Sequence, residues 1–409
     1  MSKGEMDISS GYPFWAVRNG LLAAFPPLQN DERCDVAIIG AGISGALIAN
    51  ELATHGFDVV LLEERDVGWG STSASTALIQ YEIDTHLVDL AKDYGEADAV
   101  LAYRACVDAI AMLRDVTGTL RDVGWREFDS LYYASRSRDA EPMAQEFALR
   151  EKHGFDVEWL DRARLRERYG VDARAGILNR PAAGLDPYRL TYRLLQRLKR
   201  GGTRVFDRTT VERIEPRSRD VMLTTREGMQ VRASHVIVAA GYSSQRWLTQ
   251  RVADNRSSYA FVTDPIDAET LGPLRNTLMW ESARPYLYLR TTSDDRLIVG
   301  GEDDAIDIAA RRDVQVANKT RRLVAKVKDL FPELPLEPVF SWAGTFAETR
   351  DGLPYFGPHA QYGNRVHFAM AYGGNGITYS MLGAGLLRAL IERRTHPLRA
   401  LFSFDRLKR

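Results

Sequence analysis

Short runs of consecutive apolar residues mark the buried strands near the start of the chain. Residues 36–39 form one run, residues 40–45 a glycine-rich stretch, residues 46–55 a helical segment and residues 59–62 a second apolar run. Uninterrupted hydrophobicity over about four residues suits a strand that is covered on both faces, as in a parallel sheet. The order strand, glycine turn, helix, strand therefore predicts a Rossmann-like βαβ unit.

The rest of the chain contains two further sequence patterns. The charged helical segment 97–113 and the aromatic strand 130–134 indicate an inserted second domain. The aromatic runs 259–263, 286–290 and 297–300, followed by a helix over 314–330, are typical of an antiparallel sheet covered by a helix. Other predicted elements are a helix over 186–200, a hairpin at 221–225 and 230–233, strands at 236–240 and 366–370, and a closing helix over 377–391.

We therefore expect the α/β class, with two intimately joined and discontinuous domains. Residues 1–82, 184–256 and 338–409 form the predicted Rossmann-like cofactor domain. Residues 83–183 and 257–337 form the predicted α+β substrate domain, which contains the antiparallel sheet. A length of 409 residues exceeds what one compact core usually holds, and this supports the division.

Composition excludes several classes of function. Lys and Arg number 54 against 55 Asp and Glu, so no basic field favours nucleic acid as a partner. Two cysteines, Cys34 and Cys106, are too few for a disulfide framework or a tetrahedral metal site. Residues 1–15 lack the continuous apolar stretch of a secretory signal, and no run is long enough for an integral membrane segment. We expect a cytoplasmic protein without a metal.

The glycine stretch has the spacing of a dinucleotide site, GxGxxG, at Gly40, Gly42 and Gly45. The first glycine permits the tight turn, the second lets a pyrophosphate approach the backbone, and the third allows the helix to pack on the strand. The helix start, with Ile43 and Ser44, would offer free N–H groups to the phosphates. Glu63 lies at the end of the next strand, about twenty residues on, where it would accept ribose hydroxyls. The site does not by itself distinguish FAD from NAD.

The segments beyond this motif resemble a known superfamily. The run of small and hydroxyl residues over 68–78 is similar to the loop that follows the Rossmann unit in D-amino-acid oxidase, glycine oxidase and sarcosine oxidase. The stretches 342–344, 349–354 and 371–377 resemble the closing segments of the same superfamily. The opening residues 12–15 and the ending 402–406 are nearest in texture to its gamma-glutamylputrescine oxidoreductase branch.

The resemblance implies an FAD-dependent flavoprotein of this DAO family. It assigns non-covalent FAD binding, because no cysteine follows Cys106 near the closing glycine motif, where sarcosine oxidase attaches its flavin. The cofactor-binding residues that it and the glycine motif imply are Gly40, Gly42, Ile43, Ser44, Gly45, Glu63, Glu64, Ser71, Thr72, Ser73, Ala74, Val211, Ala240, Gly241, Gly373, Gly374, Asn375, Gly376 and Ile377.

The substrate residues are predicted from a single strand. Tyr286, Tyr288 and Arg290 alternate, so they share one face, and toward the flavin they would form a pocket for an amine with an acidic group. An aromatic sheet packed on helices, with Arg290 at its edge, would have the same pattern. Phe346 stands where glycine oxidase and D-amino-acid oxidase carry a carboxylate-clamping arginine, which argues against an ordinary α-amino acid bound in that manner.

The predicted activity is oxidation of the CH–NH bond of a small amine or amino-acid derivative by hydride transfer to flavin, with hydrolysis of the imine. Two alternatives remain: a hydroxy-acid or polyol oxidoreductase of the same superfamily, and a non-catalytic flavin-binding subunit. Ile298 stands where sarcosine oxidase has an oxygen-activating lysine, which favours a cellular carrier over oxygen as electron acceptor and leaves both open.

Overall fold

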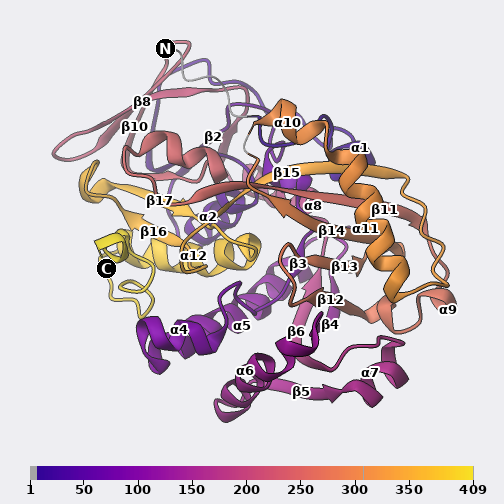
Figure 1. Ribbon diagram of the computed structural model, residues 1–409. Coiled ribbons are helices and arrows are strands. Elements are labelled where there is room, and N and C mark those ends of the chain that lie inside the picture. The colour runs from indigo at the N-terminus through magenta and orange to yellow at the C-terminus, as the bar shows by residue number, and fades with distance from the viewer. Residues whose placement is uncertain (1–6, 307, 409) are drawn as a thin grey trace.

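Two β-sheets organise the computed structural model, which describes residues 7–306 and 308–408 (Figure 1). The first sheet has the order β16-β17-β10-β1-β2-β7 and is parallel except for β16. Its strands are β1 (Glu32–Ile39), β2 (Val59–Leu62), β7 (Arg204–Phe206), β10 (Gln230–Val238), β16 (Tyr355–Pro358) and β17 (Val366–Met370). An antiparallel extension, β8 (Val211–Pro216) and β9 (Val221–Thr225), pairs with β10.

Helices cover the first sheet because its strands are apolar on both sides. The helix α2 (Ile43–Thr54) follows the glycine turn and packs between α8 (Pro187–Arg200) and α12 (Gly376–Ile391). The long helix α5 (Glu96–Gly118) packs on α12, and α4 (Leu87–Tyr94) lies against α5 (Figure 1).

The second sheet is mostly antiparallel and has the order β15-β11-β14-β13-β12-β4-β6-β3, with β5 paired to β6. Only β12 and β4 run parallel to each other within it. The strands are β3 (Leu78–Ile79), β4 (Arg126–Tyr133), β5 (Asp156–Asp161), β6 (Ala175–Gly184), β11 (Asp254–Pro265), β12 (Thr277–Glu281), β13 (Leu287–Thr291), β14 (Arg296–Asp304) and β15 (Phe340–Glu348). The helix α11 (Val316–Leu330) covers β11, β14 and β15 (Figure 1).

The remaining helices are short or lie at the margins. They are α1 (Phe14–Asn19), α3 (Ser71–Ala74), α6 (Ala140–Lys152), α7 (Arg162–Tyr169), α9 (Ala268–Leu271) and α10 (Ala309–Asp313). Single 3-10 turns occur at Ser137–Asp139, Gly241–Trp247, Gly272–Asn276, Gly363–Arg365 and Phe404–Lys408. Within residues 7–306 and 308–408, no helix combines the length and the apolar character needed to cross a bilayer.

The predicted fold class is confirmed, and two details differ from expectation. The strand β15 pairs with β11 in the second sheet, although its residues lie in the range 338–409 that we assigned to the cofactor domain. The segments 230–233 and 236–240, expected as separate strands, largely form one strand, β10. Its first half alternates in burial because it pairs antiparallel with β9, and its second half is continuously buried between β1 and β17.

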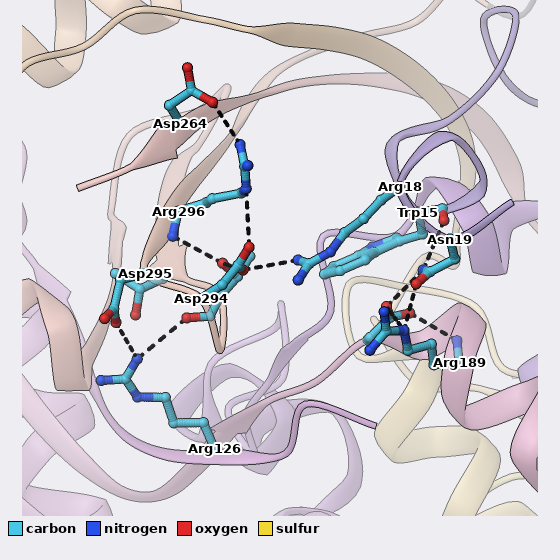
Figure 2. Close-up of polar contacts among 12 residues, drawn as sticks. Trp15, Arg18, Asn19, Arg126, Arg189, Asp264, Asp294, Asp295 and Arg296 are labelled. Carbon is cyan, nitrogen blue, oxygen red and sulfur yellow. Dashed lines mark hydrogen bonds and ion pairs between the residues drawn. The ribbon is translucent and has the colours of Figure 1, made fainter. Parts of the chain in front are cut away.

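The N-terminal segment joins the two sheets (Figure 2). The indole N–H of Trp15 donates to the Ser75 carbonyl at 2.7 Å, and Asn19 Nδ2 donates to Asp186 Oδ2 at 2.8 Å, just before α8. Arg18 pairs with Asp294 in the turn between β13 and β14 at 3.0 Å. The first six residues, part of the stretch examined for a secretory signal, lie outside the described residues.

Both cysteines are buried thiols, one in a strand of the first sheet and one in a helix. Cys34 lies in β1 and Cys106 in α5. Burial raises the pKa of Cys34 to about 12 and also raises the pKa of Cys106. Neither side chain is a reactive thiolate in the folded protein.

Candidate active site

The glycine turn after β1 has the tight geometry that its spacing predicts. Gly40 has a φ of 106°, and a Cβ there would lie 2.4 Å from the Ala239 carbonyl oxygen. A Cβ on Gly45 would lie 2.0 Å from the Gly40 carbonyl oxygen, so this glycine allows the turn to pack on α2. Gly42 is different, because a Cβ there would contact only Thr72 Oγ1, at 3.0 Å. Gly40 and Gly45 are thus required by the fold, and Gly42 leaves one side of the turn open.

Glu63 holds the turn at the end of β2. Its Oε2 accepts from the Ala41 N–H at 2.8 Å and its Oε1 from the Arg65 N–H at 3.0 Å. Burial raises the pKa of Glu63, and these hydrogen bonds oppose the rise. The neighbouring Glu64 pairs with Arg246 at 3.0 Å. Arg65 and Arg246, which the sequence did not single out, place positive charge beside this acidic pair.

The hydroxyl-rich segment forms the short helix α3 where we expected a loop. Thr72 Oγ1 accepts from the Ile43 N–H at 2.9 Å, which ties α3 to the start of α2. Ser73 Oγ donates to the Trp69 and Gly70 carbonyls and is fully buried, so it supports the segment from within. Ser71 Oγ is buried and has no hydrogen-bond partner among the described residues. An orphaned hydroxyl of this kind is suited to a ligand.

The closing glycine turn lies between β17 and α12. Gly373 has a φ of 99°, which favours glycine. The Gly374 N–H donates to Asp84 Oδ2 at 2.8 Å, and Asn375 Nδ2 donates to the Glu82 carbonyl at 2.6 Å. Asp84 follows β3 and is not part of any motif, so the sequence offered no signal for it. Burial raises the pKa of Asp84.

One cavity joins these two turns. Every predicted cofactor-binding residue lines it except Gly45 and Ser73, whose roles are in packing. Its walls continue onto the second sheet, where Trp280, Tyr286 and Tyr288 also line it. The elements that meet here come from the beginning, middle and end of the chain.

The end of the cavity formed by the second sheet is aromatic and acidic. Trp280 and Tyr286 form an edge-on pair with centroids 6.1 Å apart, and the Tyr288 hydroxyl lies 3.1 Å from Ser258 Oγ. Asp303 also lines the cavity, and burial raises its pKa to about 6. Phe346, at the position where an arginine would clamp a carboxylate, is part of the lining as well.

Residues 35–390 match the sequence model of one protein family, DAO, which is described as FAD dependent oxidoreductase. The chain belongs to this family. The resemblance inferred from the motifs is thereby confirmed, and the protein is a DAO-family FAD-dependent oxidoreductase.

Curated members of the DAO family cover nearly the whole chain. Glycine oxidase of Geobacillus kaustophilus is 29% identical over 88% of this chain and 94% of its own length. Gamma-glutamylputrescine oxidoreductase of Escherichia coli is 25% identical over 93% of this chain and 88% of its own. Among solved structures, L-proline dehydrogenase from P. horikoshii superposes with a TM-score of 0.77 at 17% identity, covering 92% of this chain and 98% of that one. The last similarity shows the fold alone.

Arg290 does not lie with Tyr286 and Tyr288 at the cavity of this DAO-family chain. Its guanidinium is buried and donates to three carbonyls, those of Thr76 at 2.7 Å, Leu185 at 2.8 Å and Thr291 at 3.0 Å. Burial lowers its pKa to about 9, so the guanidinium is charged at neutral pH. Because Arg290 does not line the cavity, this charge is not available to a substrate group there. The Arg290 side chain lies against Gly184 at the end of β6. The Thr76 carbonyl, two residues after α3, also encloses it.

Arg284 lines the cavity, whereas Ile298 does not. Arg284 brings a guanidinium to the cavity mouth, 3.7 Å from the centroid of the Tyr286 ring, and donates to the Asp84 carbonyl at 3.2 Å. Ile298 is fully buried in the core and is not part of the cavity lining. The Ile298 side chain therefore does not contact the cavity.

Proposed function

We propose that this chain binds FAD in the cavity and oxidises the CH–NH bond of a small amine or amino-acid derivative. The observation that carries the proposal is the continuity of the cavity. It runs from the glycine turn, through the closing turn at α12, to the aromatic and acidic residues of the second sheet. A dinucleotide site and a substrate-sized pocket thus share one space.

The residues present fit FAD. Gly42 leaves its side of the turn open to a pyrophosphate, and the orphaned hydroxyl of Ser71 offers an unused hydrogen-bond donor. The start of α2 adds N–H groups and a positive helix end, which favour phosphate. Glu63, which already accepts from the turn, lines the cavity at the end of β2, where it would also accept from ribose hydroxyls.

FAD, when bound, supplies an acceptor for the hydride taken from the carbon next to the substrate nitrogen. The chain contributes binding and electrostatics. Residues at the start of α12 line the cavity, and the positive end of this helix would stabilise negative charge there. Trp280, Tyr286 and Phe346 bound the substrate end with apolar surface, which excludes water and orients the reacting carbon. The imine product is then hydrolysed by water.

The flavin is expected to be fully released when the protein is precipitated by acid or heat. No cysteine or histidine lines the cavity in the part of the chain that the structure describes, and both cysteines are buried elsewhere. The measurement is the absorbance of the supernatant compared with that of the dissolved pellet. Flavin that remains with the polypeptide would contradict non-covalent binding.

Secondary amines and ω-modified amines are expected to reduce the flavin faster than glycine or D-alanine. Phe346 offers no charge to an α-carboxylate, and Arg290 is enclosed by carbonyls. An anaerobic stopped-flow series over amines, amino acids and hydroxy acids ranks the substrates. Glycine or D-alanine at the head of the ranking would contradict the argument, a hydroxy acid would favour the alternative oxidoreductase, and no reduction by any compound would favour a flavin-binding subunit.

A further inference from the structure

The strand β14 contains a bulge beside the cavity. Its pairing with β11 shifts between the pairs Gly301–Tyr259 and Asp304–Ser257. Glu302, inside the bulge, has a φ of 55°, a left-handed conformation that side chains other than glycine rarely adopt. Bulges next to active sites commonly re-aim one side chain. Here the side chain concerned is that of Asp303.

The two acidic neighbours of Asp303 face the other way. Glu302 pairs with Lys326 at 2.8 Å, and Asp304 pairs with Lys319 at 3.2 Å, both on the covering helix α11. Asp303 lines the cavity, and no lysine or arginine among the described residues forms an ion pair with it. Three consecutive acids are thus divided by the bulge into two with cationic partners and one without.

The carboxylate of Asp303 has unused binding capacity. Its Oδ1 is buried and has no hydrogen-bond partner within the described residues. Burial is the main cause of its raised pKa. The charged groups that face it are Asp84 and Glu348, which raise the pKa further, and Arg284, which lowers it, as does the Ser258 hydroxyl. The Arg256 guanidinium is paired with Glu348, and the Arg284 guanidinium lies over the Tyr286 ring, so neither arginine neutralises Asp303 directly.

Aromatic faces surround the same end of the cavity. Trp280 is held in place by Tyr132, which stacks on it with centroids 4.0 Å apart, and Tyr286 meets it edge-on. Aromatic faces attract cations, and more strongly where water is excluded. A carboxylate with a free oxygen beside such faces is a site for an ammonium group.

We propose that Asp303 binds a positively charged nitrogen of the substrate and selects cationic amines over neutral or anionic analogues. The inference rests on the proposed function and deepens it, because it names the class of compound that the cavity takes. Asp303 is a binding residue in this account, and no proton transfer is assigned to it.

The test compares two ligands of similar shape, choline and 3,3-dimethylbutan-1-ol, which differ in the charge at the branched end. Each is titrated into the FAD-loaded protein while the visible absorbance of the flavin and the thermal midpoint are followed. Choline is expected to bind about tenfold or more tightly than the alcohol. Equal affinities, or no binding of choline, would overturn the proposal without any variant having to fold.

The variant Asp303→Asn is expected to weaken choline about tenfold and leave the alcohol within about twofold. The matched control is Asp304→Asn, the neighbouring acid that faces Lys319 on α11. It is expected to keep the preference for choline. An Asp303→Asn protein that binds choline as tightly as the wild type would overturn the proposal, and so would equal losses in the two variants.

Choline keeps its charge at every pH, so its binding reports the ionisation of the protein. Since the pKa of Asp303 is raised to about 6, the carboxylate is charged above that pH, and choline binding should weaken as the pH falls through it. The pKa of Asp84 is raised as well, and the Asp303→Asn variant separates the two. An acid dependence that persists in this variant would assign the site to another group. Ligand binding without flavin reduction by any amine would contradict the proposed activity and leave this inference intact.

Discussion

Replacing Gly42 by valine is expected to give a folded protein that does not retain FAD. Gly42 has a φ of −78°, which any residue adopts, and a Cβ there would contact only the Thr72 hydroxyl. The added side chain therefore costs the fold little and occupies the space where a pyrophosphate would lie. A clash of about 1–3 kcal/mol between the valine side chain and the pyrophosphate, typical of overpacking, lowers the affinity for FAD about tenfold to hundredfold. Flavin content after purification and FAD titration of the apoprotein measure it.

The matched control for this variant is Gly385→Val. Gly385 lies in α12, and a Cβ there would meet no atom within 4 Å, so the same substitution is made away from the cavity. This protein is expected to fold and stay yellow. Gly40 and Gly45 are unsuitable for the purpose, because a Cβ at either would strike a backbone carbonyl. Full FAD occupancy in Gly42→Val would remove the assignment of the glycine turn to the cofactor.

Arg290→Ala is expected to lower the free energy of unfolding by roughly 3 kcal/mol, through buried carbonyls left without donors. Those carbonyls belong to Thr76, Leu185 and Thr291, on three different segments. The affinity for amine substrates is expected to change little, because the guanidinium does not line the cavity. Denaturant unfolding and KM values measure the two effects separately.

Arg18→Ala serves as the control for Arg290→Ala. Arg18 lies near Arg290 but is partly exposed and pairs with Asp294 (Figure 2). Loss of an exposed ion pair of this kind typically costs below about 1 kcal/mol. Unchanged stability of Arg290→Ala together with a raised KM would reverse our interpretation and restore Arg290 as a substrate contact.

Local motifs explain which parts of the site could be predicted. The turn at Gly40 and Gly45 encodes its own geometry, since a Cβ at either glycine would meet atoms within a few residues or next to the adjacent strand β10. The closing turn at Gly373 is encoded in the same way. Family membership followed from such segments, because several of them recur in order along the chain.

Long-range packing explains what could not be predicted. Strand alternation grouped Arg290 with Tyr286 and Tyr288, but the carbonyls that enclose its side chain come from residues 76 and 185, far apart in the sequence. The orientation of Asp303 depends on a bulge in β14, which shifts the alternation of side chains by one residue. Asp84 enters the site through a loop without any motif. Side-chain surroundings of this kind exist only once distant segments have packed.

The two buried cysteines can report local opening of the structure. A thiol reagent reacts only with an exposed thiolate, and in the folded protein Cys34 and Cys106 are buried with raised pKa values. The rate of alkylation of Cys34 would therefore measure how often β1 separates from the first sheet, and the rate at Cys106 how often α5 separates from α12. Loading with FAD should slow the first rate more than the second, since the glycine turn continues directly from β1.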